Sequence, residues 1–137
     1  MPQGLSPRQF QNLSAKVRAE VSALGLGDDI FVQGSRSAGT AKIGSDFDFG
    51  IRVSPQKFDE LLVKSFGNPI DNATSRSLAI SARDGRIFAG KAGLKGVRRT
   101  IMNTLNISSK DGVQISIIRR NGTFDNGPQT PLAFNFQ

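Results

Sequence analysis

The chain has 137 residues, with 18 Lys and Arg against 11 Asp and Glu, and it contains neither His nor Cys. The lack of these two residue types excludes disulfides, thiol chemistry, imidazole catalysis and His-ligated metals, so carboxylates are the main candidates for chemistry. The net charge of +7 favours polyanions such as nucleic acid, nucleotides or acidic protein surfaces as partners. No signal sequence is evident and no apolar run approaches the ~20 residues of a membrane span, which predicts one soluble domain over residues 1–137.

The first elements are a helix and a short strand. Ser6 and Pro7 have the chemistry of a helix start, and apolar residues then recur at three- and four-residue steps. This pattern predicts a helix ending near Gly25, with Arg18 off the apolar stripe as a surface charge. A continuous apolar run predicts a buried strand over residues 30–33.

Two carboxylates lie in the next predicted strand. Asp46 and Asp48 alternate with Phe47 and Phe49, so a regular strand places both acids on one face and both aromatic rings on the other. Mg²⁺ usually takes one or two protein carboxylates and completes its shell with water and phosphate oxygens. The alternative is that the two acids form an ordinary solvated face.

A glycine turn and a small polar loop separate these two strands. Gly34 lets the backbone approach a phosphate closely, and Ser35 adds a hydroxyl donor. Arg36 and Lys42, in the loop that follows, can neutralise phosphate oxygens if the loop folds over a nucleotide. An ordinary turn followed by a mobile loop is the alternative.

Helices and strands alternate through the rest of the chain, which predicts an α/β fold. Lys95, Arg98 and Arg99 lie largely off the apolar stripe of the last helix, so they are either candidate RNA or phosphate contacts or a solvated face. The predicted elements are a helix over 55–66, a weaker helix over 74–83, an extended piece over 86–89, a helix over 94–105 and a strand over 113–119.

Gly34-Ser35, ten residues and then Asp46-Phe47-Asp48-Phe49 together resemble the signature of the polymerase-beta-like nucleotidyltransferase superfamily. The resemblance implies an α/β (α+β) fold, with a small mixed sheet flanked by helices. It implies that Asp46 and Asp48 bind the Mg²⁺ or Mn²⁺ that orients a nucleoside triphosphate. It also implies that Gly34 and Ser35 hold the phosphates.

Many members of the superfamily place a third carboxylate on a later strand, and here the matching position is Gln114. Gln carries no charge to balance a metal and cannot act as a general base. Asp111 is three residues earlier, so a regular strand points it to the opposite face unless the chain bends at Gly112. The sequence therefore fits either a nucleotidyltransferase that moves a nucleotidyl group to RNA, for example tRNA, or to protein, or a binding module that kept the fold and lost the chemistry. A metal-dependent nuclease is a third interpretation.

The last residues, rich in turn formers, are expected to wrap over the core on Phe124, Leu132 and Phe134. With the motifs above, they resemble the nucleotidyltransferase-type C-terminal domains of bacterial polymorphic toxins of the Rhs and contact-dependent inhibition kinds. That resemblance implies a secreted or delivered effector, acting in the cytoplasm of a target bacterium and neutralised in its producer by a cognate immunity protein. If the chain is not such an effector, we expect a cytoplasmic protein.

Overall fold

The helices after Ser6 and Ser54 begin at the residues that the sequence indicates, whereas the helix expected over 74–83 already begins at Asn72, as the computed structural model of residues 1–42 and 44–134 shows. Ser6 and Gln9 form a reciprocal capping box at the start of the first helix. Ser54 and Asp71 accept backbone hydrogen bonds at the starts of the next two long helices. The elements are α1 (Pro7–Ala23), β1 (Ile30–Gln33), α2 (Ser35–Ala38), β2 (Phe47–Val53), α3 (Pro55–Phe66), α4 (Asn72–Asp84), β3 (Arg86–Phe88), α5 (Ala89–Ala92), α6 (Lys95–Leu105), β4 (Val113–Arg119) and β5 (Gln129–Pro131).

The strands form one five-stranded sheet in the order β3-β4-β2-β1-β5. β2 and β4 are parallel, and the other neighbouring pairs are antiparallel. This arrangement confirms the expected mixed sheet flanked by helices. It places β2, which carries Asp48, in the centre between β1 and β4.

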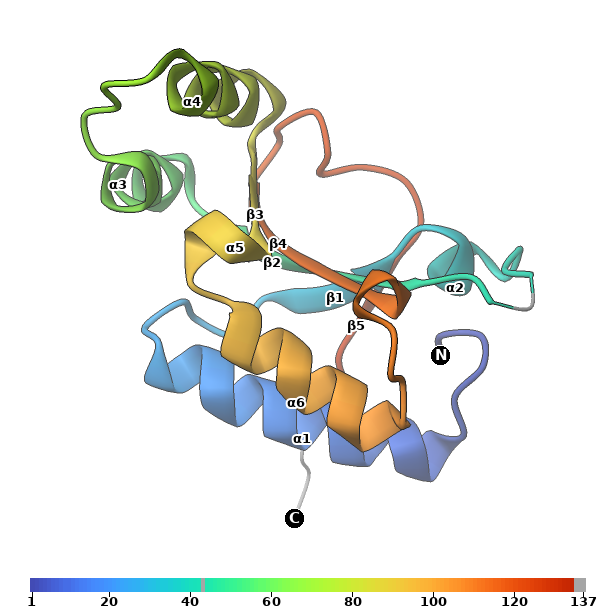
Figure 1. The fold of residues 1–137 in the computed structure, drawn as a ribbon. Helices are drawn as coiled ribbons and strands as arrows, with labels where there is room; N and C mark the ends of the chain where they lie inside the picture. Colours follow the sequence, from blue (N-terminus) through green and yellow to red (C-terminus); the bar gives the residue numbers. More distant parts are fainter. Residues whose placement is uncertain (43, 135–137) are drawn as a thin grey trace.

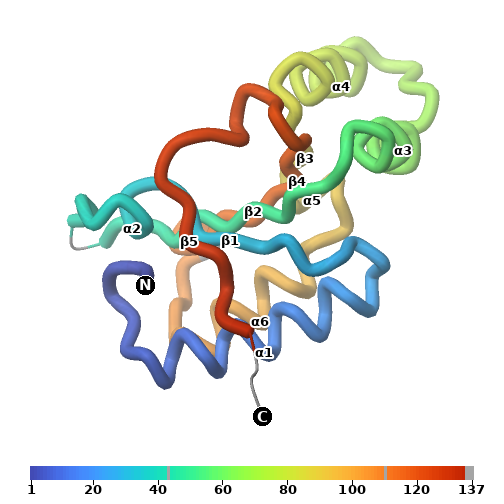
Figure 2. The backbone as a smooth tube through the Cα atoms, turned by 180° about the vertical axis from the view of Figure 1, so that it is seen from behind, coloured from blue at the N-terminus to red at the C-terminus, as the bar shows by residue number. Residues whose placement is uncertain are grey.

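One face of the sheet forms the main core. Alternate residues of the central strands, among them Val32, Phe49 and Ile115, are fully or almost fully buried and pack with Val17 of α1 and Ile101 of α6. The two helices lie side by side beneath this face in both views (Figures 1 and 2). Burial of these apolar stripes is the main source of stability for the fold.

The opposite face is more polar. The chain between β4 and β5, residues 120–128, arches over it in both views (Figures 1 and 2). Arg52 of β2 fixes this covering segment, because its guanidinium pairs with Asp125 at 2.8 Å. The same guanidinium also pairs with Asp29, directly before β1, at 2.9 Å. Burial alone would raise the pKa of Asp125, but hydrogen bonds from Arg52, from the Asn121 N–H and from Gln129 lower it to about 2.

The structure corrects three expectations. Arg18 is more than a surface charge, because it donates to the carbonyl oxygens of Ala133, Leu132 and Asp28 at 2.6–2.9 Å and so holds the C-terminal segment.

Of the three apolar anchors expected in that segment, only Leu132 is buried. The rings of Phe124 and Phe134 are exposed and lie against arginines, Arg86 and Arg18 respectively.

Short elements were not expected from the sequence. α2, α5 and β5 have only three or four residues each, too few to show a period. The extended piece expected over 86–89 ends at Phe88, where α5 begins. Residues 135–137 of the expected C-terminal wrap lie outside the described residues. Within the described part, no helix has both the length and the apolar character needed to cross a membrane.

Candidate active site

Asp48 lies in a row of three polar residues across the centre of the sheet. Its Cα partner on β1 is Gln33, and its Cα partner on β4 is Gln114. The strand alternation directs all three side chains to the polar face, whereas Phe47 and Phe49 lie on the core face. The register therefore places Gln114 beside Asp48, and its match to the position of a third carboxylate remains a prediction.

The Asp48 carboxylate is largely buried and only partly satisfied. Gln33 donates from Nε2 to Oδ2 at 3.2 Å, and the Nη2 atom of Arg86 lies 3.5 Å from Oδ1. Oδ1 is buried, and no described residue gives it a hydrogen bond. Burial raises the pKa of Asp48, while the Arg86 charge and the Gln33 hydrogen bond act in the opposite direction and the negative charge of Asp46 adds to the increase.

Asp46 is exposed and lies directly before β2, which begins at Phe47. The expectation that both acids belong to one strand is therefore wrong, because the regular pairing starts one residue later. Asp46 is nevertheless close enough for its charge to act on Asp48.

The donors fit a divalent cation that takes only one or two protein carboxylates. Asp46 and Asp48 supply that number, and the buried Oδ1 of Asp48 lacks a hydrogen-bond donor. A fuller acidic cage is not present. Among the described residues, no group of three or more Asp, Glu, His and Cys side chains is placed to hold a metal.

Asp111 does not join the two acids. It lies in a 3-10 turn over Lys110–Gly112, where its backbone N–H is bonded to Ser109, and its side chain is exposed. No described contact links it to Asp48. The regular register of β4 therefore leaves Gln114 as the nearest match to the third position.

The glycine turn faces the same space as Asp48. Gly34 has φ 74° and ψ −152°, and apart from its chain neighbours no atom of the described residues lies within 4 Å of the position that a Cβ would occupy, so the backbone is open on that side. Ser35 follows as the first residue of α2. A pocket of about 260 Å³ is lined by Gln33, Gly34, Asp48, Arg86, Phe124, Asn126, Gly127 and Pro128. Gly34 and Asp48 therefore line one pocket, whereas Asp46 and Ser35 are not among its described lining residues, and the binding roles of all four remain predictions.

The two loop cations have different surroundings. Arg36 donates to the carbonyl oxygens of Gln3 and Ser45, and its guanidinium lies 4.2 Å from the centroid of the Phe47 ring. These contacts hold the loop against the sheet. Lys42 is exposed. A phosphate contact remains a prediction for both residues.

Arg86 is the site residue that sequence reasoning missed. It comes from the edge strand β3, donates from Nε to the Ser116 hydroxyl at 3.0 Å and lies 4.7 and 4.9 Å from the ring centroids of Phe88 and Phe124. The sequence indicated only that Arg86 and Phe88 alternate in a short extended piece, which places both side chains on the same face of a strand. It could not show that the guanidinium meets Asp48, which is far away in the sequence.

The cations of α6 are not part of this pocket. Lys95, Arg98 and Arg99 line a separate hollow with Met102, on a helix that packs against the core face rather than the polar face. Their contact with RNA or phosphate remains a prediction.

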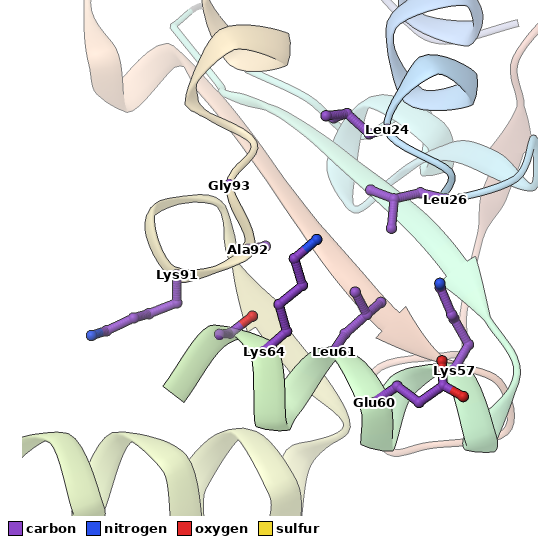
Figure 3. A pocket seen from close by; sticks show the side chains of 10 residues that line it. Leu24, Leu26, Lys57, Glu60, Leu61, Lys64, Lys91, Ala92 and Gly93 are labelled. Atoms are coloured by element: carbon purple, nitrogen blue, oxygen red, sulfur yellow. The ribbon is translucent and has the colours of Figure 1, made fainter. Parts of the chain in front are cut away.

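A further hollow of about 310 Å³ lies between α1, α3 and α5 (Figure 3). Lys57 and Lys64 point toward Leu26 across it, while Lys91 points away. Its described lining has one carboxylate, Glu60, so it does not offer a two-acid clamp. This hollow adjoins α3, and α3 follows the C-terminal end of β2, whereas Asp48 lies near the N-terminal end of that strand.

Comparison with known proteins supports one interpretation of this arrangement. A family model described as a nucleotidyltransferase domain matches residues 14–102, which include the Gly34 turn, both acids and Arg86 and end before β4. No curated protein and no solved structure gives a significant match to the chain.

Proposed function

The chain belongs to the nucleotidyltransferase domain family, and from that membership we propose that it moves a nucleotidyl group from a nucleoside triphosphate to a hydroxyl group of RNA, for example tRNA, or of protein. The observation that carries this proposal is the pocket in which the open Gly34 turn faces the largely buried carboxylate of Asp48. Such a pocket combines a backbone that phosphates can approach with an acid that can hold a cation.

Asp46 and Asp48 are the residues that would hold Mg²⁺ or Mn²⁺. When bound, that ion neutralises the phosphate charge and polarises the phosphorus centre toward attack. The chain's own contribution is positioning. Gly34 leaves room for phosphate oxygens, the Ser35 hydroxyl can donate to them, and Arg36 and Lys42 add positive charge to the adjoining loop.

A second candidate is a module that binds nucleotide, RNA or a partner protein without transfer chemistry. It is favoured by the amide of Gln114 opposite Asp48, where a carboxylate would supply charge for deprotonating the acceptor. The ion pair of Asp48 with Arg86 also favours it, because a guanidinium already meets the carboxylate that a metal requires.

We further propose that residues 1–137 form a single domain of an antibacterial effector, with RNA or protein as acceptor and a cognate immunity protein as partner. The support is the sequence resemblance and the net charge of +7, which suits an RNA acceptor. Lys95, Arg98 and Arg99 are the proposed RNA contacts. Expression in a bacterium should arrest growth, and D48N should relieve the arrest. Equal growth with both proteins contradicts the effector role and leaves the transfer activity to be judged separately.

The experiment that tests the transfer activity is incubation with each labelled triphosphate, Mg²⁺ or Mn²⁺ and a bacterial lysate. Label should appear in RNA or in protein, and the acceptor class follows from whether ribonuclease or protease removes it. D48N should abolish the labelling, because it removes the central carboxylate. Absence of transfer with every triphosphate and both metals rejects the enzyme and favours the binding module.

A further inference from the structure

The Arg86 guanidinium faces the candidate nucleotide pocket with part of its bonding capacity unused. Its side chain is 13% exposed and lines the pocket together with Gly34 and Asp48. Nε donates to Ser116 and Nη2 lies against Asp48, but Nη1 has no hydrogen-bond partner among the described residues. A guanidinium offers five N–H donors in a planar fork, and this one has donors left for a further acceptor.

Two aromatic rings fix the guanidinium in this position. Phe88 lies two residues along the same strand, and Phe124 reaches over from the segment that covers the polar face. Stacking on both rings and the bond to Ser116 hold the side chain independently of Asp48. The carboxylate can therefore be replaced as a partner while the arginine stays in the pocket.

The charges of the pocket oppose two simultaneous bonds to Asp48. Nη2 of Arg86 already lies 3.5 Å from Oδ1, so a divalent cation on this carboxylate would stand close to the guanidinium, and like charges repel strongly where water is scarce. A triphosphate removes the conflict, because it brings several negative charges and oxygen acceptors that match the guanidinium fork.

We propose that Arg86 is a phosphate-binding residue that serves as the counter-ion of Asp48 before nucleotide binds and then pairs with the triphosphate, freeing Asp48 for the cation. This inference rests on the proposed nucleotide site and adds an exchange of partners to it. Arg86 therefore makes cation binding depend on the nucleotide, since it competes for Asp48 until phosphate oxygens take over.

Two binding measurements without catalysis test the exchange. The first titrates the protein with Mn²⁺ alone and follows the free ion by electron paramagnetic resonance. R86Q should bind Mn²⁺ about tenfold tighter than wild type, because the competing charge is gone. The second titrates with inorganic tripolyphosphate alone by calorimetry. Here R86Q should bind about tenfold more weakly, because a charge-assisted hydrogen bond is lost.

The matched control is R83Q, which makes the same charge change at an exposed arginine paired with Asp84. It should leave both affinities within about twofold of wild type. If Arg86 only supported the structure of the pocket, R86Q would bind both Mn²⁺ and tripolyphosphate more weakly. Tighter Mn²⁺ binding by R86Q therefore distinguishes the exchange of partners from a loss of pocket structure. R86K keeps the charge and loses the fork, and it should weaken tripolyphosphate binding without tightening Mn²⁺ binding.

The proposal is overturned if R86Q binds Mn²⁺ no more tightly than wild type, or if it binds tripolyphosphate as well as wild type does. If R86Q does not fold, R86K decides, and wild-type affinity of R86K for tripolyphosphate overturns the proposal. If both measurements behave as expected while no nucleotidyl transfer is found, the exchange stands and the proposed enzyme activity fails.

Discussion

Replacing Gly50 by alanine should destabilise the fold by about 2 kcal/mol, because the site of its missing side chain is filled by Phe31. A Cβ at this position would lie 2.5 and 2.7 Å from Cζ and Cε2 of the Phe31 ring and 3.1 Å from Cγ1 of Ile118. The ring cannot easily swing away, since Phe31 is 1% exposed and the Arg52 guanidinium lies 4.6 Å from its centroid. Overpacking in such a site costs about 1–3 kcal/mol.

The measurement is urea unfolding followed by far-ultraviolet circular dichroism, since the chain has neither Trp nor Tyr. The control is Gly96→Ala in α6, where a Cβ would meet no described atom within 4 Å other than those of its own helix backbone, so the alanine should be neutral or stabilise by up to about 1 kcal/mol. If Gly50→Ala is as stable as wild type, the Phe31 ring does not lie over Gly50. The arrangement of the polar face derived above would then be wrong.

Three more predictions concern the polar face, β4 and the C-terminal segment. Because the pKa of Asp125 is lowered to about 2, its stabilisation is complete above its ordinary pKa of 3.8 and is lost as the pH falls from there toward 2. Urea midpoints should record a loss of about 1–2 kcal/mol over that window, and Asp125→Asn should remove this part of the pH dependence. Gln114→Asp should tighten Mn²⁺ binding and raise any transfer whereas Asp111→Asn changes little, and the reverse ranking would identify Asp111 as the third ligand. Arg18→Met should lower the free energy of unfolding in urea by about 1–2 kcal/mol, because three carbonyl oxygens lose their donor. Lys16→Met, at an exposed position of the same helix, should be near neutral. Equal stability of the two variants would show that Arg18 does not hold the C-terminal segment.

The elements that sequence predicted best are those with a local signal. The capped helix after Ser6 and the alternating strand over 113–119 appear almost as expected, because caps and periodicity act over a few residues. Gly34 and Asp48, which were singled out from the sequence because their spacing resembles a known motif, line the same pocket, and their binding roles remain predictions.

The features that sequence could not predict depend on distant residues. The pairing of Arg86 with Asp48 requires the strand order, which places β3 next to β4 and β4 next to β2. Phe124 was expected in the core because phenylalanine is usually buried, but here it stacks on Arg86 at the pocket. Asp46 was expected inside a strand because its sequence alternates, yet the ladder begins only at Phe47.

We propose that Asp46 and Asp48 hold the cation through which a triphosphate binds this pocket. The most direct test of this proposal is the affinity of a non-hydrolysable nucleoside triphosphate measured with and without Mg²⁺, for wild type and for D46N/D48N. The control double variant D59N/E60Q makes the same charge change at two exposed positions of α3. We expect Mg²⁺-dependent binding to be lost only in D46N/D48N, and we expect that variant to keep its circular dichroism spectrum. Binding that persists in D46N/D48N, or unfolding of that variant, would contradict the assignment of the two acids.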